Sequence, residues 1–127
     1  MDITLRRNLV QLNKNKEIGR KGESLAAEYL INKGFNILER NYRYGRLEID
    51  IIGKIENTIV FIEVKTRQSN RFGYPEEAVD NKKTDHILSC ADHFIYQNQW
   101  RGDIRFDIIS VLLKPEISIE HIEDAFY

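Results

Sequence analysis

Two acidic residues and a lysine lie on neighbouring predicted strands that are otherwise rich in apolar side chains. Asp50 belongs to the stretch 47–52, and Glu63 and Lys65 belong to the stretch 59–67. Because side chains alternate along a strand, we expect Leu47, Ile49 and Ile51 to share one face of the first stretch, and Glu48 and Asp50 the other. By the same rule Glu63 and Lys65 should point to the same side, about 7 Å apart. A short polar turn over residues 53–58 joins the two stretches, so we expect antiparallel pairing that brings Asp50 beside Glu63.

A nearby cation would be expected to neutralise such a pair of carboxylates. Two carboxylates about 4 Å apart repel by roughly 4 kcal/mol at an effective dielectric near 20. Carboxylate oxygens suit Mg²⁺ or Mn²⁺, and a metal-activated water could attack a phosphodiester while Lys65 stabilises the developing charge. The alternative is an ordinary cross-strand salt-bridge network, since the triplet Glu63-Val64-Lys65 is not specific by itself.

Glu23 is a third candidate ligand, on a helix predicted over residues 17–33 with Gly34 as its stop signal. Its neighbours one turn away are small: Gly19, Ala26 and Ala27. A carboxylate at this position could look past them toward the surface on which the helix packs. A solvated glutamate at the helix edge is the alternative.

Basic and aromatic residues flank the predicted strands at their loop ends. The candidate nucleic-acid contacts are Arg43, Arg46, Arg67, Arg71 and Lys82, interleaved with Tyr42, Tyr44, Phe72 and Tyr74. Arginines of this kind grip phosphates and aromatic rings stack on unpaired bases, although the same residues also serve to solubilise loops and close a core. A further stripe, His86, Cys90 and His93, spreads over two turns of a predicted helix, which disfavours a shared ion.

The remaining pattern indicates a single α/β domain. A strand beginning near residue 35, a helix over 77–97 and strands over 104–113 and 117–121 complete the order α-β-β-β-α-β-β. This order predicts a mixed sheet flanked by helices. Residues 1–16 are compatible with a short amphipathic helix or a loosely attached arm, and residues 17–127 form the domain.

Length and charge narrow the function classes. The chain has 127 residues and a net charge of −1, which argues against wholesale electrostatic binding of nucleic acid but leaves a local basic surface open. No apolar run approaches the roughly 20 residues of a membrane span, and no secretory signal is visible, so we expect a cytoplasmic protein without membrane contact. The single cysteine, Cys90, agrees with a reducing compartment.

Several segments together resemble the YraN-like family of bacterial proteins. They are Gly19-Arg20-Lys21-Gly22-Glu23, Arg40-Asn41-Tyr42-Arg43, Glu48-Ile49-Asp50, Phe61-Ile62-Glu63-Val64-Lys65-Thr66-Arg67, Phe72-Gly73 and Arg105-Phe106-Asp107. That family is similar to the archaeal Holliday junction resolvases and is grouped with the PD-(D/E)XK nucleases. Ile49 stands where the motif name has proline.

The resemblance implies a restriction-endonuclease-like core with a Mg²⁺ or Mn²⁺ site at Glu23, Asp50 and Glu63, and with Lys65 as a catalytic partner. The implied activity is endonucleolytic hydrolysis of branched or structured DNA, and by analogy a homodimer, because a symmetric branch needs two active sites. Two alternatives stay open: a nucleic-acid-binding protein of this fold that does not cleave, and a protein-interaction domain whose acids form structural ion pairs.

Overall fold

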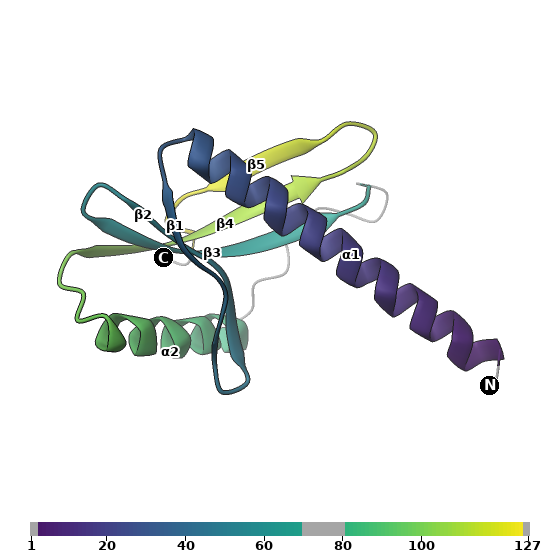
Figure 1. Ribbon diagram of the computed structural model, residues 1–127, viewed down its shortest axis with the longest axis horizontal. Helices are drawn as coiled ribbons and strands as arrows, with labels where there is room; N and C mark the ends of the chain where they lie inside the picture. Colours follow the sequence, from purple (N-terminus) through teal and green to yellow (C-terminus); the bar gives the residue numbers. More distant parts are fainter. Residues whose placement is uncertain (1–2, 70–80, 126–127) are drawn as a thin grey trace.

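The computed structural model describes residues 3–69 and 81–125. A single mixed sheet of five strands, in the spatial order β1-β2-β3-β4-β5, lies between two helices (Figure 1). The elements are α1 (Ile3–Asn32), β1 (Asn36–Tyr44), β2 (Leu47–Ile55), β3 (Thr58–Arg67), α2 (Asn81–Gln97), β4 (Asp103–Leu112) and β5 (Ser118–Ile122). The expected α/β class, with a mixed sheet flanked by helices, is confirmed at this level.

Strand pairing follows from the lengths of the connections. β1, β2 and β3 form an antiparallel meander, whereas β3 and β4 are parallel and are connected through α2. A parallel pair requires such a long crossover, and β5 then returns antiparallel to β4. The predicted antiparallel pairing of β2 with β3 is confirmed, with Ile51 opposite Ile62 and Ile52 opposite Phe61.

The predicted stop of the first helix is confirmed at Gly34. Its φ of 103° is accessible to glycine and strained for other residues, and the chain turns out of α1 there. The Phe35 N–H donates to the Leu30 carbonyl at 2.9 Å, and the Gly34 N–H donates to the Ile31 carbonyl at 3.0 Å. These two bonds form a Schellman motif, and Phe35 and Leu30 are buried in the same core cluster.

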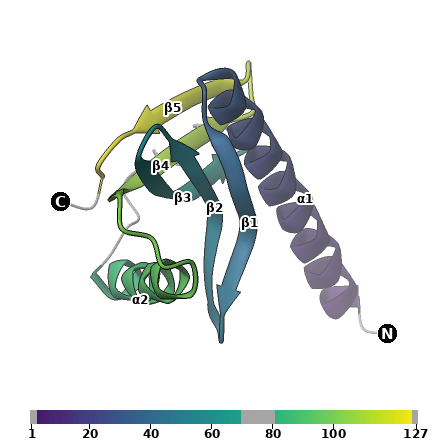
Figure 2. The ribbon, with the colours of Figure 1, turned by 60° about the vertical axis from the view of Figure 1, so that its left-hand side comes forward.

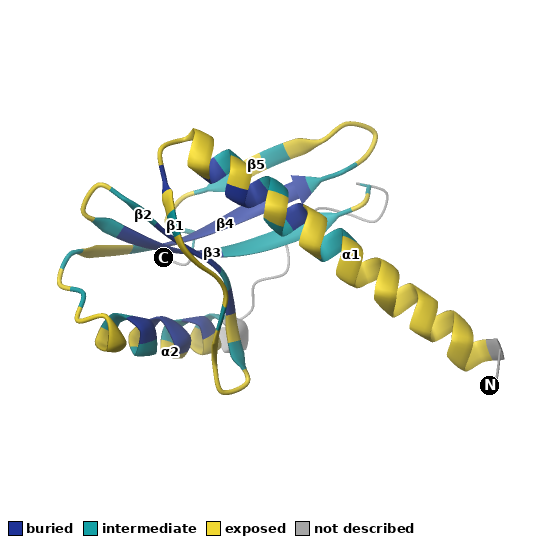
Figure 3. Cartoon of the chain, in the orientation of Figure 1, coloured by how far each residue is buried: buried dark blue, intermediate teal, exposed yellow. Residues whose placement is uncertain are grey.

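α1 is longer than the helix predicted over residues 17–33, because residues 3–16 continue it without interruption. Figure 3 shows this N-terminal part as exposed, projecting beyond the sheet. The exposed side chains include Leu5, Leu9 and Leu12. Of the helices in the described ranges, neither has the length and apolar character needed to cross a membrane.

The helices cover opposite faces of the sheet (Figure 2). Each face has its own apolar core. The cluster under α1 is centred on Ala26, Leu30, Ile51, Ile62 and Ile109. The cluster under α2 is centred on Ile49, Phe61, Cys90, Phe94 and Phe106. Alternate residues of β3 therefore serve different helices, which explains why this central strand is apolar on both sides.

One facing prediction is wrong. Leu47, Ile49 and Ile51 were expected to share a face of β2, but Leu47 and Ile49 pack in the α2 cluster and Ile51 packs in the α1 cluster. The change occurs at Asp50, where the paired residues of β2 and β3 end at Ile51 and Ile62. On the other side, Asn41 lies opposite Asp50 in β1 and has a left-handed φ of 53°. The strand therefore changes face at the candidate acid.

Candidate functional site

Asp50 and Glu63 line one cavity of about 260 Å³ on the α2 face of the sheet. Arg46, Leu47 and Glu48 from the β1–β2 hairpin and β2, and His86 and Ile87 from α2, complete its described lining. Asp50 and Glu63 are both half-buried. Asp50 and Glu63, which the sequence predicted to lie side by side, thus share a pocket with Glu48 and Arg46.

A backbone hydrogen bond orients Asp50. Where β2 leaves β3, the Val64 N–H has no strand carbonyl opposite it and instead donates to Asp50 Oδ2 at 2.8 Å. Burial first, and then repulsion by the neighbouring Glu63, raise the pKa of Asp50 to about 7, although the Val64 hydrogen bond acts to lower it. Glu23 and Glu48 add smaller repulsions in the same direction.

Glu23 approaches this group from the α1 side. Its Oε1 accepts a hydrogen bond of 2.7 Å from the side-chain amide of Asn41, the residue opposite Asp50 in β1. Burial raises the pKa of Glu23, repulsion by Glu48 adds to it, Arg40 opposes it, and Glu63 contributes a further rise. Glu23, Glu48, Asp50 and Glu63 therefore form one repelling electrostatic group, which we call the acidic group.

Glu48 was not singled out as a site residue in the sequence, although its spacing from Asp50 was a usable signal. It lines the pocket and forms an ion pair of 3.3 Å with Arg43. Its charge raises the pKa of both Glu23 and Asp50. The acidic group is thus larger than the three acids predicted.

The donor chemistry fits a hard divalent cation. Within residues 3–69 and 81–125, no three His, Cys, Asp or Glu side chains stand close enough to enclose a metal ion as they lie. Mg²⁺, however, is usually held by only one or two carboxylates, with water and substrate phosphate oxygens completing its shell. Asp50 and Glu63 in a shared pocket meet that smaller requirement, and a cation would relieve their repulsion.

Lys65 is half-buried on the same side of β3 as Glu63. Val64, between them, packs against the α1 cluster, so alternation turns Glu63 and Lys65 toward the α2 face. Lys65 lies one strand period beyond Glu63, outside the described lining of the pocket.

The predicted nucleic-acid contacts are only partly gathered at the pocket. Arg46 lines it, and Arg43 is close by through its ion pair with Glu48. Arg67 ends β3 opposite Leu112 of β4, further along the strand. Arg71 lies outside the described residues, as does the side chain of Lys82, whose backbone belongs to the first turn of α2.

Comparison with known proteins identifies the family of this chain. Residues 22–111 match the sequence model described as "Uncharacterised protein family UPF0102". The chain belongs to the UPF0102 family. A UPF0102 protein of Clostridioides difficile is 49% identical over 113 residues, covering 88% of this chain and 98% of the relative. A UPF0102 protein of Christiangramia forsetii is 43% identical over 114 residues, covering 89% and 96%.

The UPF0102 match confirms the YraN-like resemblance read from the motifs. The matched span includes Glu23, Asp50, Glu63 and Lys65, and it excludes the projecting start of α1. The candidate site therefore lies in the part of the chain that the family shares. A UPF0102 protein of Phocaeicola vulgatus, 44% identical over 114 residues, covers 89% of this chain and 94% of its own length.

The histidine and cysteine stripe of α2 packs against the β1–β2 hairpin of this UPF0102 chain. His86 lines the pocket, Cys90 is buried with its Sγ 3.9 Å from the Tyr42 carbonyl, and His93 Nδ1 lies 2.7 Å from the Tyr42 hydroxyl. Cys90 and His93 thus both contact Tyr42 in β1, and His86 lines the pocket together with Arg46 of the hairpin. These contacts join α2 to the β1–β2 hairpin.

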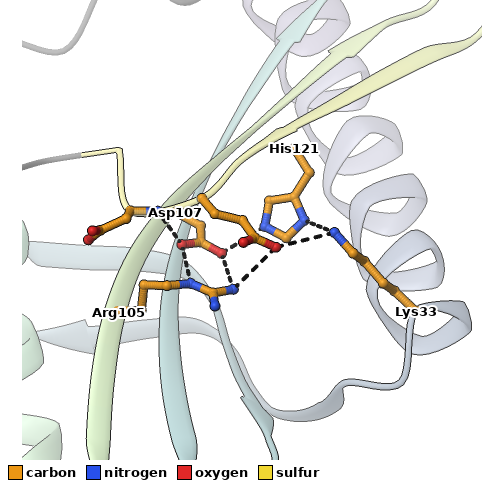
Figure 4. Close-up of polar contacts among 6 residues, drawn as sticks. Lys33, Arg105, Asp107 and His121 are labelled. Carbon is orange, nitrogen blue, oxygen red and sulfur yellow. Dashed lines mark hydrogen bonds and ion pairs between the residues drawn. The ribbon is translucent and has the colours of Figure 1, made fainter.

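A second polar cluster, missed in the sequence, lies on the α1 face (Figure 4). Asp107 is fully buried and accepts hydrogen bonds from Arg105 Nε and Nη2, both at 2.9 Å, from His121 Nε2 at 2.7 Å and from the Asp124 N–H at 3.0 Å. Burial alone would raise the pKa of Asp107, but these hydrogen bonds outweigh it and lower the pKa. With four donors the carboxylate is saturated, so this cluster serves structure.

Lys33 ties the same cluster to the end of α1. Its Nζ lies 3.0 Å from His121 Nδ1 and 3.5 Å from Glu123 Oε1. Since an ammonium group only donates, the contact assigns a neutral His121 that carries its proton on Nε2, facing Asp107. The motif Arg105-Phe106-Asp107 was visible in the sequence, but its partners come from other elements.

Proposed function

We propose that this protein is a divalent-metal-dependent endonuclease that hydrolyses phosphodiester bonds in branched or structured DNA. The observation that carries the proposal is the shared pocket of Asp50 and Glu63, two partly buried and mutually repelling carboxylates with Arg46 beside them. Support also comes from the strand-borne Glu63-Val64-Lys65 triplet, which is typical of PD-(D/E)XK nucleases. A surface salt bridge would not need its acids buried together.

The roles follow from the contacts. Asp50, fixed by the Val64 N–H, and Glu63 would hold Mg²⁺ or Mn²⁺, with Glu23 as the third acid of the site. The ion, when bound, supplies Lewis-acid stabilisation of the phosphoryl group and a more acidic water. Lys65 would donate to a non-bridging phosphate oxygen and stabilise the added negative charge of the transition state. Arg46 would hold a neighbouring phosphate at the pocket wall.

The direct test is cleavage of labelled four-way junction, flap, duplex and single-stranded DNA with Mg²⁺ or Mn²⁺. We expect Glu63→Gln and Lys65→Met each to lower cleavage at least about a hundredfold, as removal of one transition-state contact typically does. Glu39→Gln, at an exposed β1 position, and Lys114→Met, at an exposed position after β4, are the matched controls. Wild-type cleavage no greater than that of Glu63→Gln on every substrate would contradict the proposal.

A second candidate is a nucleic-acid-binding protein without cleavage. It is favoured by the lack, in the described part of the chain, of three ligands already arranged around an ion. This candidate predicts salt-sensitive DNA binding that survives Lys65→Met and needs no metal. Binding without turnover, unaffected by Mg²⁺ or Mn²⁺, would select it over the endonuclease.

The endonuclease proposal includes a homodimer, because resolving a symmetric branch requires two sites related by a two-fold axis. Light scattering of the protein with and without junction DNA measures the stoichiometry. A single chain bound to one junction would restrict the proposed activity to asymmetric structures such as flaps.

A further inference from the structure

The end of the β1–β2 hairpin carries an exposed aromatic ring with a rigid backing. Tyr44, the last residue of β1, is 46% exposed. Its ring stacks on the imidazole of His93 from α2, with ring centroids 3.9 Å apart and planes 11° from parallel. A tyrosine at a hairpin end would otherwise sample several rotamers, so this stacking fixes the orientation of the ring.

The backing is itself anchored in the core. His93 Nδ1 and the Tyr42 hydroxyl are hydrogen-bonded at 2.7 Å, and the Tyr42 ring meets Phe94 edge-on with centroids 5.3 Å apart. Phe94 is buried in the α2 cluster, where its ring also packs on Phe61. A chain of aromatic contacts therefore runs from the core through Tyr42 and His93 to Tyr44, which makes the exposed ring a preorganised surface.

The ring lies next to the acidic pocket. Leu47, the cross-strand partner of Tyr44, lines that pocket, and so does Arg46 in the turn between them. On α2, His93 follows the pocket residue His86 by two helical turns, about 10 Å. A strand with one phosphate in the pocket can thus place a neighbouring nucleotide at Tyr44.

The charges around the ring suit a nucleic-acid strand. Arg43 precedes Tyr44, and its side chain is 74% exposed although it contacts Glu48. Arg46 follows two residues later, so cations flank the ring on both sides along the chain. Aromatic rings interleaved with arginines are the usual means of binding unpaired nucleotides, since each base offers a π-face and each linkage a phosphate.

We propose that Tyr44, held by His93, is a stacking platform for an unpaired base beside the scissile phosphate. The inference rests on the proposed function, because the acidic pocket defines where the scissile phosphate lies. It deepens that function by naming the substrate class: DNA with unpaired nucleotides at a branch, flap or bulge, in preference to continuous duplex. In an intact duplex each base is already stacked and is not available to the ring.

The test is a measurement of DNA binding in EDTA, because removal of divalent ions prevents the proposed cleavage while binding is measured. Labelled flap and blunt duplex of equal length are titrated with wild-type protein and with Tyr44→Phe and Tyr44→Leu. Stacking of one base on an aromatic ring corresponds to roughly a ten- to hundredfold change in affinity. We expect Tyr44→Leu to weaken flap binding about tenfold or more, Tyr44→Phe to stay within about twofold of wild type, and duplex binding to change little.

A control variant tests whether loss of any exposed tyrosine weakens flap binding, and a fluorescent base reports stacking directly. Tyr96→Leu changes a tyrosine that is 78% exposed near the end of α2, outside the described pocket lining, and should leave flap binding unchanged. A 2-aminopurine at the unpaired position should be quenched on binding to wild-type protein and should regain its emission with Tyr44→Leu, provided that the variant keeps its Tm.

Equal loss of flap and duplex binding, or none at all, in a folded Tyr44→Leu variant would overturn the platform. Cleavage that depends on Glu63 and Lys65 would survive that outcome, and only the substrate preference would be lost. Conversely, quenching and flap preference that depend on Tyr44, without any cleavage, would retain the platform and remove the endonuclease.

Discussion

At the scale of single residues, the protonation of Asp50 links the site to stability. Its pKa is raised to about 7, first by burial and then by Glu63, whereas an unfolded chain loses this proton near pH 4. Between these values the folded state binds more protons than the unfolded state. The free energy of unfolding of the metal-free protein should therefore fall as pH rises from about 4 to about 7.

Urea denaturation from pH 4.5 to 8 in EDTA measures this slope, which for one group is at most about 1.4 kcal/mol per pH unit. Asp50→Asn should flatten it, because the amide stays neutral in both states. Asp92→Asn, at an exposed position of α2, is the control. An unchanged slope in Asp50→Asn would show that another group carries the pH dependence.

Metal binding should compete with the same proton. Because a ligand carboxylate must be ionised, Mg²⁺ or Mn²⁺ should raise Tm more at pH 8 than at pH 6. At a concentration a hundred times Kd the stabilisation is about 2.7 kcal/mol. Asp50→Asn and Glu63→Gln should abolish the rise, as measured by thermal scans. If Mg²⁺ and Mn²⁺ leave the Tm unchanged at both pH values, the result would favour the alternative that this is a protein-interaction domain whose acids form structural ion pairs.

The proximity of Asp50 and Glu63 was predictable because it depends on two local properties, strand alternation and a short turn. The same strand alternation would have identified Glu48, because it lies two residues before Asp50. The role of Asp107 could not be found in this way, since Arg105 is near in sequence but His121 reaches Asp107 from β5, and Lys33, just after α1, contacts His121. Long-range convergence of this kind leaves no spacing signal.

At the scale of elements, the crossing of α1 over β3 sets where Glu23 lies. A Cβ at Gly22 would collide with the Thr66 hydroxyl oxygen and would lie only 2.6 Å from Thr66 Cγ2 and 2.7 Å from Thr66 Cβ. Gly22→Ala must therefore move α1 off β3, and with it the adjacent Glu23. We expect a loss of about 1–3 kcal/mol in urea denaturation, the usual cost of overpacking, together with weaker metal binding.

Gly19→Ala is the matched control, since a Cβ there meets nothing within 4 Å. Replacing a mid-helix glycine at an open position should stabilise α1 by about 0.5–1 kcal/mol. The two substitutions are identical in chemistry and lie one turn apart, so opposite signs would isolate the contact with Thr66. Equal signs would show that helix propensity, and no close approach, governs this helix.

Element bounds were recoverable where local chemistry fixes them. Gly34 marks the end of α1, and the short turn after Ile55 fixes the register of β2 with β3. The change of face at Asp50 was not recoverable, because it arises where β2 leaves β3 and where Asn41 takes a left-handed conformation. For α2, the predicted start at residue 77 lies outside the described residues, and its end at Gln97 agrees with the prediction.

At the scale of the whole molecule, one face of the sheet carries the Asp107 cluster and the other carries the acidic pocket. The register pairs Ile62 with Asp107 and Glu63 with Ile108. Successive residues of β3 therefore lie beside the Asp107 cluster on one face and line the acidic pocket on the other. α1 reaches both, through Lys33 at its C-terminal end and through Glu23 near its middle. A substitution in the Asp107 cluster should therefore lower the stability of the protein and leave metal binding in the acidic pocket intact.

Asp107→Asn tests this separation. Removing one charge from a buried, fully hydrogen-bonded pair costs about 3–5 kcal/mol, and we expect a loss of that order in urea denaturation. The pKa of Asp107 is lowered by its donors, so its contribution is complete above the unfolded value near pH 4 and is lost as pH falls through the folded pKa. Wild-type protein should consequently lose stability in acid, and the variant should lose less.

The separation also makes a prediction about metal. If the two faces act independently, the Tm of Asp107→Asn will be lower than that of wild type, but the rise produced by Mg²⁺ or Mn²⁺ at pH 8 will be nearly the same, because sites that share no contacts contribute additively. Glu120→Gln, at an exposed position of β5 beside His121, is the control for a change at the surface. A metal-induced rise that disappears in Asp107→Asn would mean that β4 transmits strain to Glu63, and the two faces would then have to be treated as one coupled unit.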